Sequence, residues 1–396
     1  MARIVVEAEA SRGQPLGMTP ARFLRDYWQK RPLLIRAAFP QFQNVISPDD
    51  LAGIACQESA LARLVVRDQR RDRWQLRQGP FTEADFGSLP TSHWTLLVQD
   101  VDKWDADVAA LLAPFSFLPA WRIDDVMISY ATPGGGVGAH VDNYDVFLIQ
   151  GRGKRRWRID IDPQASKEFR EDSELKLLKQ FTPTHDWILN PGDALYLPPG
   201  IAHDGVAIDE CMTYSVGMRA PSLPELIVDY ADSIAEPLDE EVRYVDPDLT
   251  PARDPNEIDA AAMRRVQAAL AELRDADPAA LQEWFGRFIT RYRSAHEAIP
   301  AKRALSAGQI AEKLAGARVL RNPWSRIAWS RRGRGADLFL AGQSFRCSVA
   351  FARLLASQRE LAGDDVLQRG AKRDLGVLAD MVCAGHFLIV KPKSRR

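Results

Sequence analysis

Three side chains constrain the fold of this chain more than any other feature. His140 and Asp142 form an H-x-D pair, and His203 follows 61 residues after Asp142. Residues i and i+2 of a β-strand share a face, so His140 and Asp142 can point into a barrel while Val141 packs outward. Two imidazoles and one carboxylate occupy one side of an octahedral ion and leave the other side open, which is typical of non-heme Fe(II) oxygenases. The pair therefore predicts a barrel that holds a metal ion.

The residues around these ligands predict the strands that carry them. Gly134 lies six residues before His140, and the string Gly192-x5-Pro198-x-Gly200-x2 ends in His203. Proline fixes φ and glycine permits positive φ, so this string predicts a strand followed by a tight corner. The two motifs together are typical of a cupin, or double-stranded β-helix. Short runs rich in β-branched and aromatic residues support it: 126–130, 146–149, 156–159, 187–189, 194–197 and 212–216.

A basic residue inside the barrel would select a 2-oxo acid as cosubstrate. Such an acid chelates iron through one end and needs a cation for its far carboxylate. Arg155 is the candidate, because strand alternation places it on one face with Trp157 and places Lys154 and Arg156 on the other. Ser129 offers either a second hydrogen bond to the cosubstrate or a bond to its own strand, and the residues alone leave both open.

The length of the chain and its cysteine content limit the class of protein it can be. The chain has 396 residues, which predicts two or three domains. Its four cysteines are scattered and contain no C-x-x-C motif, as in a reduced compartment. The first residues lack the apolar segment of a secretory signal, and no stretch approaches a membrane span. We therefore expect a cytoplasmic protein with no membrane partner.

The α+β chain is expected to divide into three parts: a cupin domain with an N-terminal α/β extension (1–220), a helical domain (221–300) and a winged-helix-like domain (301–396). The last part carries 19 Lys/Arg against 7 Asp/Glu. This basic excess indicates either a solvated face or affinity for rRNA or another nucleic acid.

Helices are expected at 257–276 and after Asp277, a predicted N-cap followed by Pro278. An apolar stripe follows the cap and indicates either a homodimer, which we favour, or packing within the chain; it comprises Leu281, Trp284, Phe285, Phe288, Ile289 and Tyr292. In the last part we expect helices at 306–314, 349–361 and 375–384, a hairpin between the first two, and a strand at 387–390.

Longer segments carry a resemblance to a known family. The segments 23–34, 98–104, 133–147 and 214–221 resemble signatures of the bacterial JmjC-type ribosomal oxygenases, which hydroxylate an arginine of a large-subunit ribosomal protein. The resemblance implies iron on His140, Asp142 and His203, and the far carboxylate of 2-oxoglutarate on Arg155 and Ser129. It also implies the order cupin domain, helical dimerisation domain and winged helix. The arginine at position 155 resembles the residue at this position in the bacterial branch of the family.

The expected activity is that of an Fe(II)/2-oxoglutarate-dependent dioxygenase that uses O2 to hydroxylate the β-carbon of a ribosomal-protein arginine. Two enzymatic alternatives use the same machinery: hydroxylation of a ribosomal histidine and demethylation of N-methyl-lysine. A non-enzymatic alternative is a cupin that senses a small molecule and binds nucleic acid through its basic C-terminal domain.

Overall fold

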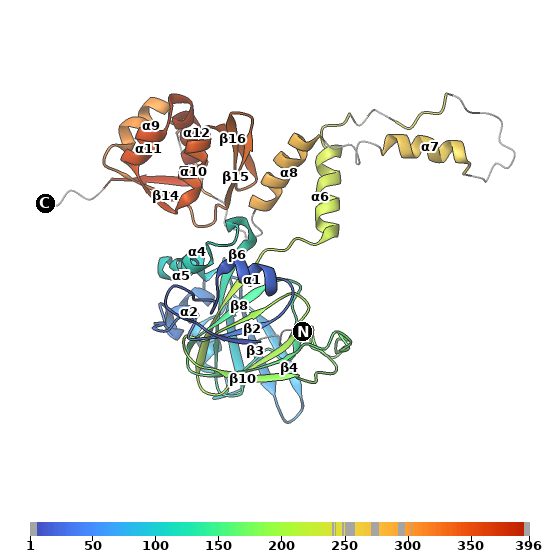
Figure 1. The fold of residues 1–396 in the computed structure, drawn as a ribbon, viewed down its shortest axis with the longest axis vertical. Coiled ribbons are helices and arrows are strands. Elements are labelled where there is room, and N and C mark those ends of the chain that lie inside the picture. Colours follow the sequence, from blue (N-terminus) through green and yellow to red (C-terminus); the bar gives the residue numbers. More distant parts are fainter. Residues whose placement is uncertain are drawn as a thin grey trace. The chain divides into compact units, whose positions relative to one another are not determined.

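The computed structural model describes residues 6–239, 241, 243–247, 249, 258–270, 277–291, 298–301 and 303–391. The chain forms two compact units, Met1–Ala220 and Pro221–Arg396, which are described separately (Figure 1). Among the described residues no helix is both long and apolar enough to span a lipid bilayer.

The first unit is built from two facing sheets. The larger sheet has the strand order β1-β2-β11-β8-β13-β6-β5-β3-β4 and the smaller one β10-β9-β12-β7. The large sheet comprises β1 (Glu7–Glu9), β2 (Leu33–Arg36), β3 (Ala62–Asp68), β4 (Arg73–Gln78), β5 (Trp94–Val98), β6 (Ile123–Ala131), β8 (Val146–Arg152), β11 (Ala194–Leu197) and β13 (Cys211–Met218). The small sheet comprises β7 (His140–Val141), β9 (Arg155–Asp160), β10 (His185–Leu189) and β12 (Ala202–Ala207). This arrangement confirms the double-stranded β-helix.

Alternation along the strands gives the large sheet two different faces. Phe147 and Ile149 of β8 join a core with Phe23 and Leu51 from the covering helices, whereas Leu148 joins a cluster inside the sandwich. The helices of this unit are α1 (Pro20–Asp26), α2 (Pro48–Ala55), α3 (Glu83–Gly87), α4 (Val101–Trp104) and α5 (Ala106–Ala110). Because the inner cluster takes Trp157 and Ile159 from β9, it holds the two sheets together and fixes the register of the strands that carry the site.

The second unit begins with three helices: α6 (Leu223–Ala235), α7 (Ala260–Ala269) and α8 (Pro278–Thr290). Its remainder contains two small sheets, β18-β14-β19 and β15-β16-β17. The elements are α9 (Ala307–Leu314), β14 (Arg318–Arg321), β15 (Ile327–Arg332), β16 (Gly335–Leu340), β17 (Gln343–Cys347), α10 (Val349–Ser357), β18 (Glu360–Ala362), α11 (Gly363–Arg369), α12 (Lys372–Cys383) and β19 (Phe387–Val390).

The helix expected at 349–361 is shorter than predicted. It ends at Ser357, and residues 360–362 instead form β18, which pairs with β14. The strand β14 and the helix α11 have no counterpart in the expected elements. The N-cap Asp277 is confirmed, because its carboxylate accepts hydrogen bonds from the N–H groups of Ala279 and Ala280. Tyr292, the ends of the 257–276 segment and the C-terminal tail lie wholly or partly outside the described residues.

The apolar stripe of α8 is largely covered by the chain itself. Phe288 and Ile289 are buried, and a Cβ built on Gly286 would lie 2.3 Å from the ring of Phe339 on β16. Trp284 stacks on Phe288 and donates a hydrogen bond to Asp229 of α6. Packing within the second unit therefore accounts for most of this stripe. The boundary expected at residue 300, between the helical domain and the winged-helix-like domain, stays a prediction.

Candidate metal centre

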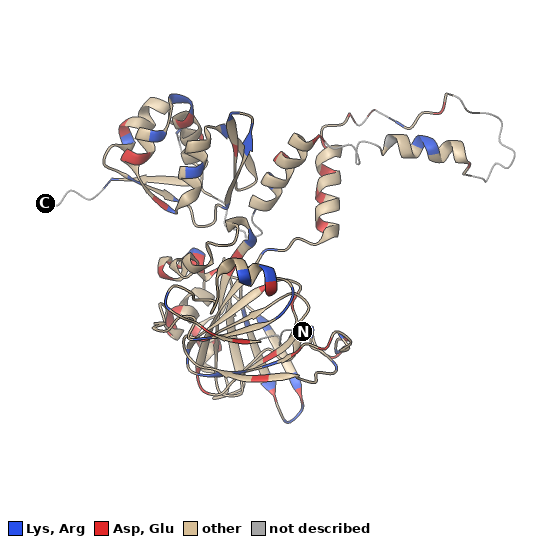
Figure 2. Cartoon of the chain, in the orientation of Figure 1, with Lys and Arg blue, Asp and Glu red and all other residues tan. Residues whose placement is uncertain are grey.

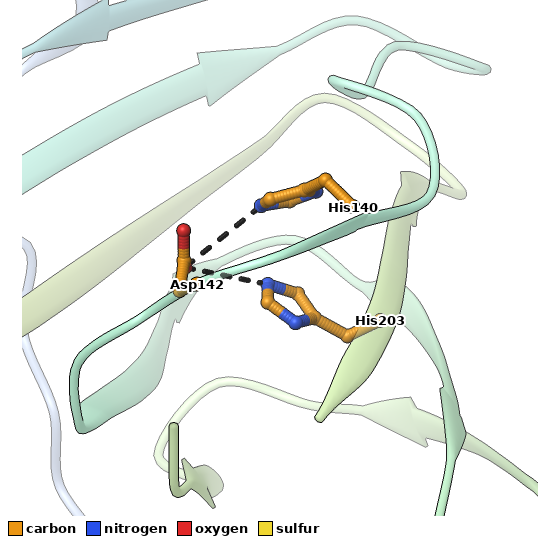
Figure 3. A group of neighbouring side chains, drawn as sticks. All are labelled: His140, Asp142 and His203. Atoms are coloured by element: carbon orange, nitrogen blue, oxygen red, sulfur yellow. Dashed lines mark ion pairs between the residues drawn. The ribbon is translucent and has the colours of Figure 1, made fainter. Parts of the chain in front are cut away.

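Two paired strands, β7 and β12, bring His140, Asp142 and His203 together (Figure 3). His140 and His203 lie directly opposite each other on β7 and β12, so both side chains project from the same face of the small sheet. Asp142 follows β7 by one residue, and its Oδ2 lies 3.9 Å from Nε2 of His140 and 3.6 Å from Nε2 of His203. One ligand atom from each residue lies within 4.8 Å of the others. Among the described residues this is the one group of three or more His, Cys, Asp or Glu side chains with that geometry.

Backbone carbonyls fix which nitrogen each imidazole presents. Nδ1 of His140 lies 2.9 Å from the carbonyl oxygen of Gly138, and Nδ1 of His203 lies 2.9 Å from that of Ile201. A carbonyl only accepts, so Nδ1 carries the proton in both rings and Nε2 keeps its lone pair. Burial and the neighbouring His140 lower the pKa of His203 to about 4, so this ring is neutral near pH 7. Both Nε2 atoms are thus prepared to bind a cation.

Exposure differs among the three ligands. The His203 side chain is 3% exposed, whereas His140 and Asp142 are 23% and 25% exposed. The metal position is therefore buried on the side of His203 and open to solvent on the side of His140 and Asp142. An ion that must bind further ligands needs such an open side.

Arg155 points from the small sheet toward the large one. Its Nη1 donates to the hydroxyls of Ser129 on β6 (3.0 Å) and Thr213 on β13 (3.1 Å), and the side chain is buried. Its Nε is also buried, yet has no hydrogen-bond partner in the described part of the chain. A buried guanidinium with an unpartnered edge and no carboxylate beside it fits a carboxylate ligand, since such groups are rarely left unsatisfied.

Trp157 lies between this guanidinium and the metal ligands. Its ring centroid is 5.4 Å from the Arg155 guanidinium carbon and 6.0 Å from the ring centroid of His203. Gly205 makes room for the indole, because a Cβ there would lie 2.6 Å from the ring. The register on β9 and β12 pairs Ile159 with His203 and Ala207 with Arg155. Four strand residues span about 13 Å of backbone, so the side chains must shorten this separation for one molecule to touch both the Arg155 guanidinium and the metal.

Asp145 follows the metal ligand Asp142 by three residues but has a different role. Asp145 is fully buried and accepts hydrogen bonds from Tyr196 (2.6 Å), Gln29 (2.9 Å) and Arg122 (3.3 Å). It joins the barrel to the residues that follow α1. Although it is close to the metal ligands in sequence, strand alternation turns it to the helix-covered face of β8.

The glycine loop at 134–138 is held against neighbouring backbone. Gly134 N–H donates to the carbonyl of Ala207, and Ala207 N–H donates to that of Gly135. Added Cβ atoms would lie 2.3 Å from the Trp94 carbonyl oxygen at Gly135 and 2.5 Å from that of Gly205 at Gly136. The glycines permit close backbone approach just before His140.

Sequence reasoning missed Thr213 and Gln150. Thr213 contacts Arg155 directly, and its own hydroxyl donates to Oε1 of Gln150 at 3.1 Å. The sequence signal for these two residues was weak, because a buried polar residue in an otherwise apolar strand becomes informative only once its neighbours across the sheet are known.

Comparisons with known proteins agree with this geometry. Residues 110–226 match the family described as the JmjC domain, and residues 271–387 match the ROXA-like winged helix. The chain is 41% identical over 308 residues to the ribosomal protein uL16 3-hydroxylase of Escherichia coli, which covers 76% of this chain and 81% of that protein. It is 43% identical over 214 residues to a probable ribosomal oxygenase of Haemophilus influenzae, covering 54% of this chain and 52% of that one.

Solved structures give the same result over nearly the whole chain. The X-ray structure of E. coli YcfD superposes with a TM-score of 0.83 at 36% identity, covering 94% of this chain and 99% of that one. A structure of YcfD, described as a ribosomal oxygenase, in complex with cobalt and 2-oxoglutarate superposes with a TM-score of 0.79 at the same identity and coverage. The chain therefore belongs to the family of JmjC-domain ribosomal oxygenases with a ROXA-like winged helix.

Proposed function

We propose that this protein is an Fe(II)- and 2-oxoglutarate-dependent dioxygenase that uses O2 to hydroxylate the β-carbon of an arginine in a large-subunit ribosomal protein. One observation carries the proposal: the two Nε2 atoms and the Asp142 carboxylate converge at one end of the sandwich interior, and a buried guanidinium with an unpartnered Nε lies further along it. A cation centre and an anion-binding group on the same small sheet match the two ends of a chelating dicarboxylate.

Each residue has a defined role in this proposal. His140, Asp142 and His203 would hold Fe(II), which with 2-oxoglutarate and O2 supplies the oxidising power for C–H hydroxylation and yields succinate and CO2. Arg155 binds the far carboxylate through its Nε edge, and Ser129, whose hydroxyl oxygen already accepts from Nη1, retains a proton to donate to the same carboxylate. Trp157 excludes water from the space between them.

The ribosomal target follows from the relatives rather than from the cavity. The E. coli relative is named a uL16 3-hydroxylase, and carbon 3 of an amino acid is its β-carbon. Arginine at position 155 and the resemblance to the bacterial branch favour an arginine over a histidine as the target residue. We therefore expect the uL16 counterpart to be the substrate and the cytoplasm, where ribosomes assemble, to be the location.

The test is turnover of 2-oxoglutarate by purified protein loaded with Fe(II), with a panel of ribosomal-protein peptides. Succinate should form in step with a peptide that gains the mass of one oxygen atom on an arginine. Oxidation of a histidine, or loss of a methyl group from lysine, would support the enzymatic alternatives instead. Steeply salt-dependent DNA binding with no succinate from any peptide would support the sensor alternative.

The second unit suggests a homodimer through α6. This helix has no buried residue, and Leu223, Ile227 and Val228 are 68%, 58% and 60% exposed. Apolar residues so placed on one amphipathic helix favour association with a second copy of the chain.

We also expect the winged-helix unit to make a weak contact with rRNA. Lys and Arg recur along the β15-β16 hairpin and the neighbouring helices, with acidic residues among them (Figure 2). Arg332 and Arg346 already pair with Asp337, and Arg332 also pairs with Glu283. These pairs reduce the local excess of positive charge, so we expect weak, salt-sensitive RNA binding.

A further inference from the structure

A row of three buried polar residues crosses the large sheet beneath the Arg155 guanidinium. Ser129 on β6 lies directly opposite Thr213 on β13, and Thr213 lies directly opposite Gln150 on β8. Residues paired in this way share a face of the sheet, and here it is the face toward the small sheet. Thr213 and Gln150 are 1% and 0% exposed, so neither is available to solvent.

The direction of each hydrogen bond in this row is determined. The Gln150 side-chain amide lies 2.8 Å from the carbonyl of Arg152 and 3.1 Å from that of Gly153, both of which only accept. Its NH2 group must therefore face them, and Oε1 must face Thr213. The single hydroxyl proton of Thr213 goes to that oxygen, which leaves the Thr213 lone pairs facing Nη1 of Arg155.

Gln150 also holds the turn from which Arg155 emerges. Arg152 and Gly153 end β8 and enter the turn to β9, whose first residue is Arg155, and Gly153 has a φ of 61°. The amide thus fixes the backbone two residues before Arg155 while its oxygen orients the hydroxyl that receives the arginine tip. Arg155 is restrained at both ends by one side chain.

We infer that Gln150 and Thr213 are positioning residues that fix the Arg155 guanidinium and so set the affinity for the 2-oxo acid. The inference rests on the proposed function, because it assumes that Arg155 binds the far carboxylate. Because both Nη1 protons are bonded to Ser129 and Thr213, the guanidinium is held in one orientation. The Arg155 side chain therefore loses little conformational entropy when its Nε edge binds a carboxylate. Neither residue contacts the metal ligands or supplies a group that reacts.

The experiment compares Thr213→Val with Thr213→Ser in the full-length protein. Valine keeps the β-branched shape and removes the hydroxyl, whereas serine keeps the hydroxyl. Thr290→Val is the matched control, because Thr290 is equally buried, also makes hydroxyl hydrogen bonds, and lies in the other unit. Calorimetry without oxygen, on protein loaded with Mn(II), gives the Kd for 2-oxoglutarate, and a separate titration gives the Kd for Mn(II).

We expect Thr213→Val to raise the Kd for 2-oxoglutarate about tenfold, the typical effect of losing a hydrogen bond to a charged group. The KM for 2-oxoglutarate should rise with it, while kcat at saturation, the Kd for Mn(II) and the Thr290→Val values stay near wild type. Thr213→Ser should restore most of the affinity. Gln150→Leu, which leaves β13 unchanged, should weaken binding several-fold, and in the double variant with Thr213→Val it should add less than its effect alone, because only its contact with the turn remains to be lost.

Wild-type affinity in Thr213→Val and Gln150→Leu would overturn the inference and leave the proposed function standing. An equal loss in Thr290→Val, or a parallel loss of Mn(II) affinity, would also overturn it, because the effect would then be general destabilisation. If the wild-type protein with Mn(II) bound no 2-oxoglutarate at all, the proposed function would fail together with the inference.

Discussion

His140 and His203 are turned toward the metal position by the same device. Each lies opposite the other across β7 and β12, and each donates its Nδ1 proton to the carbonyl of the residue two positions before it. The bond fixes the ring and leaves Nε2 as the only donor to a cation. The site is therefore organised by backbone geometry as well as by the choice of ligands.

Replacing Asp142 with alanine should abolish 2-oxoglutarate turnover and weaken metal binding strongly. The carboxylate is partly exposed and lies beside the two histidines, so its removal takes away a ligand without opening the core. Far-UV circular dichroism should be unchanged. Asp107→Ala, at an exposed position in α5, is the control and should retain full turnover. Equal turnover in both variants would refute the role of Asp142.

Asp145→Ala, in contrast, should lower the free energy of unfolding rather than remove a metal ligand. It removes a fully buried carboxylate that accepts three side-chain hydrogen bonds and leaves Arg122 without this partner. We expect a loss of about 3 kcal/mol in the free energy of unfolding, measured in urea. Tyr196→Phe removes only one of these bonds and should cost about 1 kcal/mol. A folded Asp145→Ala protein of wild-type stability but without activity would show that this residue acts at the metal site rather than in the core.

Asp125 should make stability depend on pH. Burial and the nearby Asp100 raise the pKa of Asp125 to about 7, above its ordinary value. The folded state then binds a proton more tightly than the unfolded state, so this residue penalises folding above pH 7 and the penalty fades as the pH falls toward 4. Asp125→Asn removes the titration and can still accept the N–H of Asp100. The Tm difference, variant minus wild type, should therefore grow from pH 5 to pH 8; a constant difference would contradict it.

Gly286→Ala should destabilise the second unit by about 1–3 kcal/mol, because the added methyl group meets the Phe339 ring. Gly376→Ala in α12, with nothing within 4 Å of its Cβ position, should stabilise the same unit by about 0.5–1 kcal/mol. Urea unfolding of both variants measures the effects. If residues 221–300 formed a separate domain, unfolding of the winged-helix part would not respond to Gly286→Ala.

Ile227→Asp should convert a dimer to a monomer in sedimentation velocity experiments. The side chain is 58% exposed within one copy, so the charge should not disturb folding of the chain. Leu388→Asp, at a position 61% exposed on β19, introduces the same charge elsewhere and should leave the mass unchanged. A monomeric wild-type protein, or a dimer that survives Ile227→Asp, would contradict assembly through α6.

The sequence predicted the parts of the site that depend on local geometry. Two-residue periodicity placed His140 beside Asp142 and placed Arg155 and Trp157 on one buried face. It could not identify Thr213 and Gln150, because their partners lie 58 and 63 residues away along the chain and meet only through strand register. The helix at 349–361 was predicted too long for a similar reason: pairing with β14 draws residues 360–362 into a strand.

The metal ligands and the Arg155 network belong to different parts of the sandwich. His140, Asp142 and His203 are all carried by the small sheet, whereas Arg155 of that sheet meets hydroxyls of the large one. An ion alone would thus tie together only neighbouring strands of one layer. A dicarboxylate bound to the ion at one end, and to Arg155 and the Ser129 hydroxyl of the large sheet at the other, would bridge the layers, so its binding free energy would add directly to resistance against their separation.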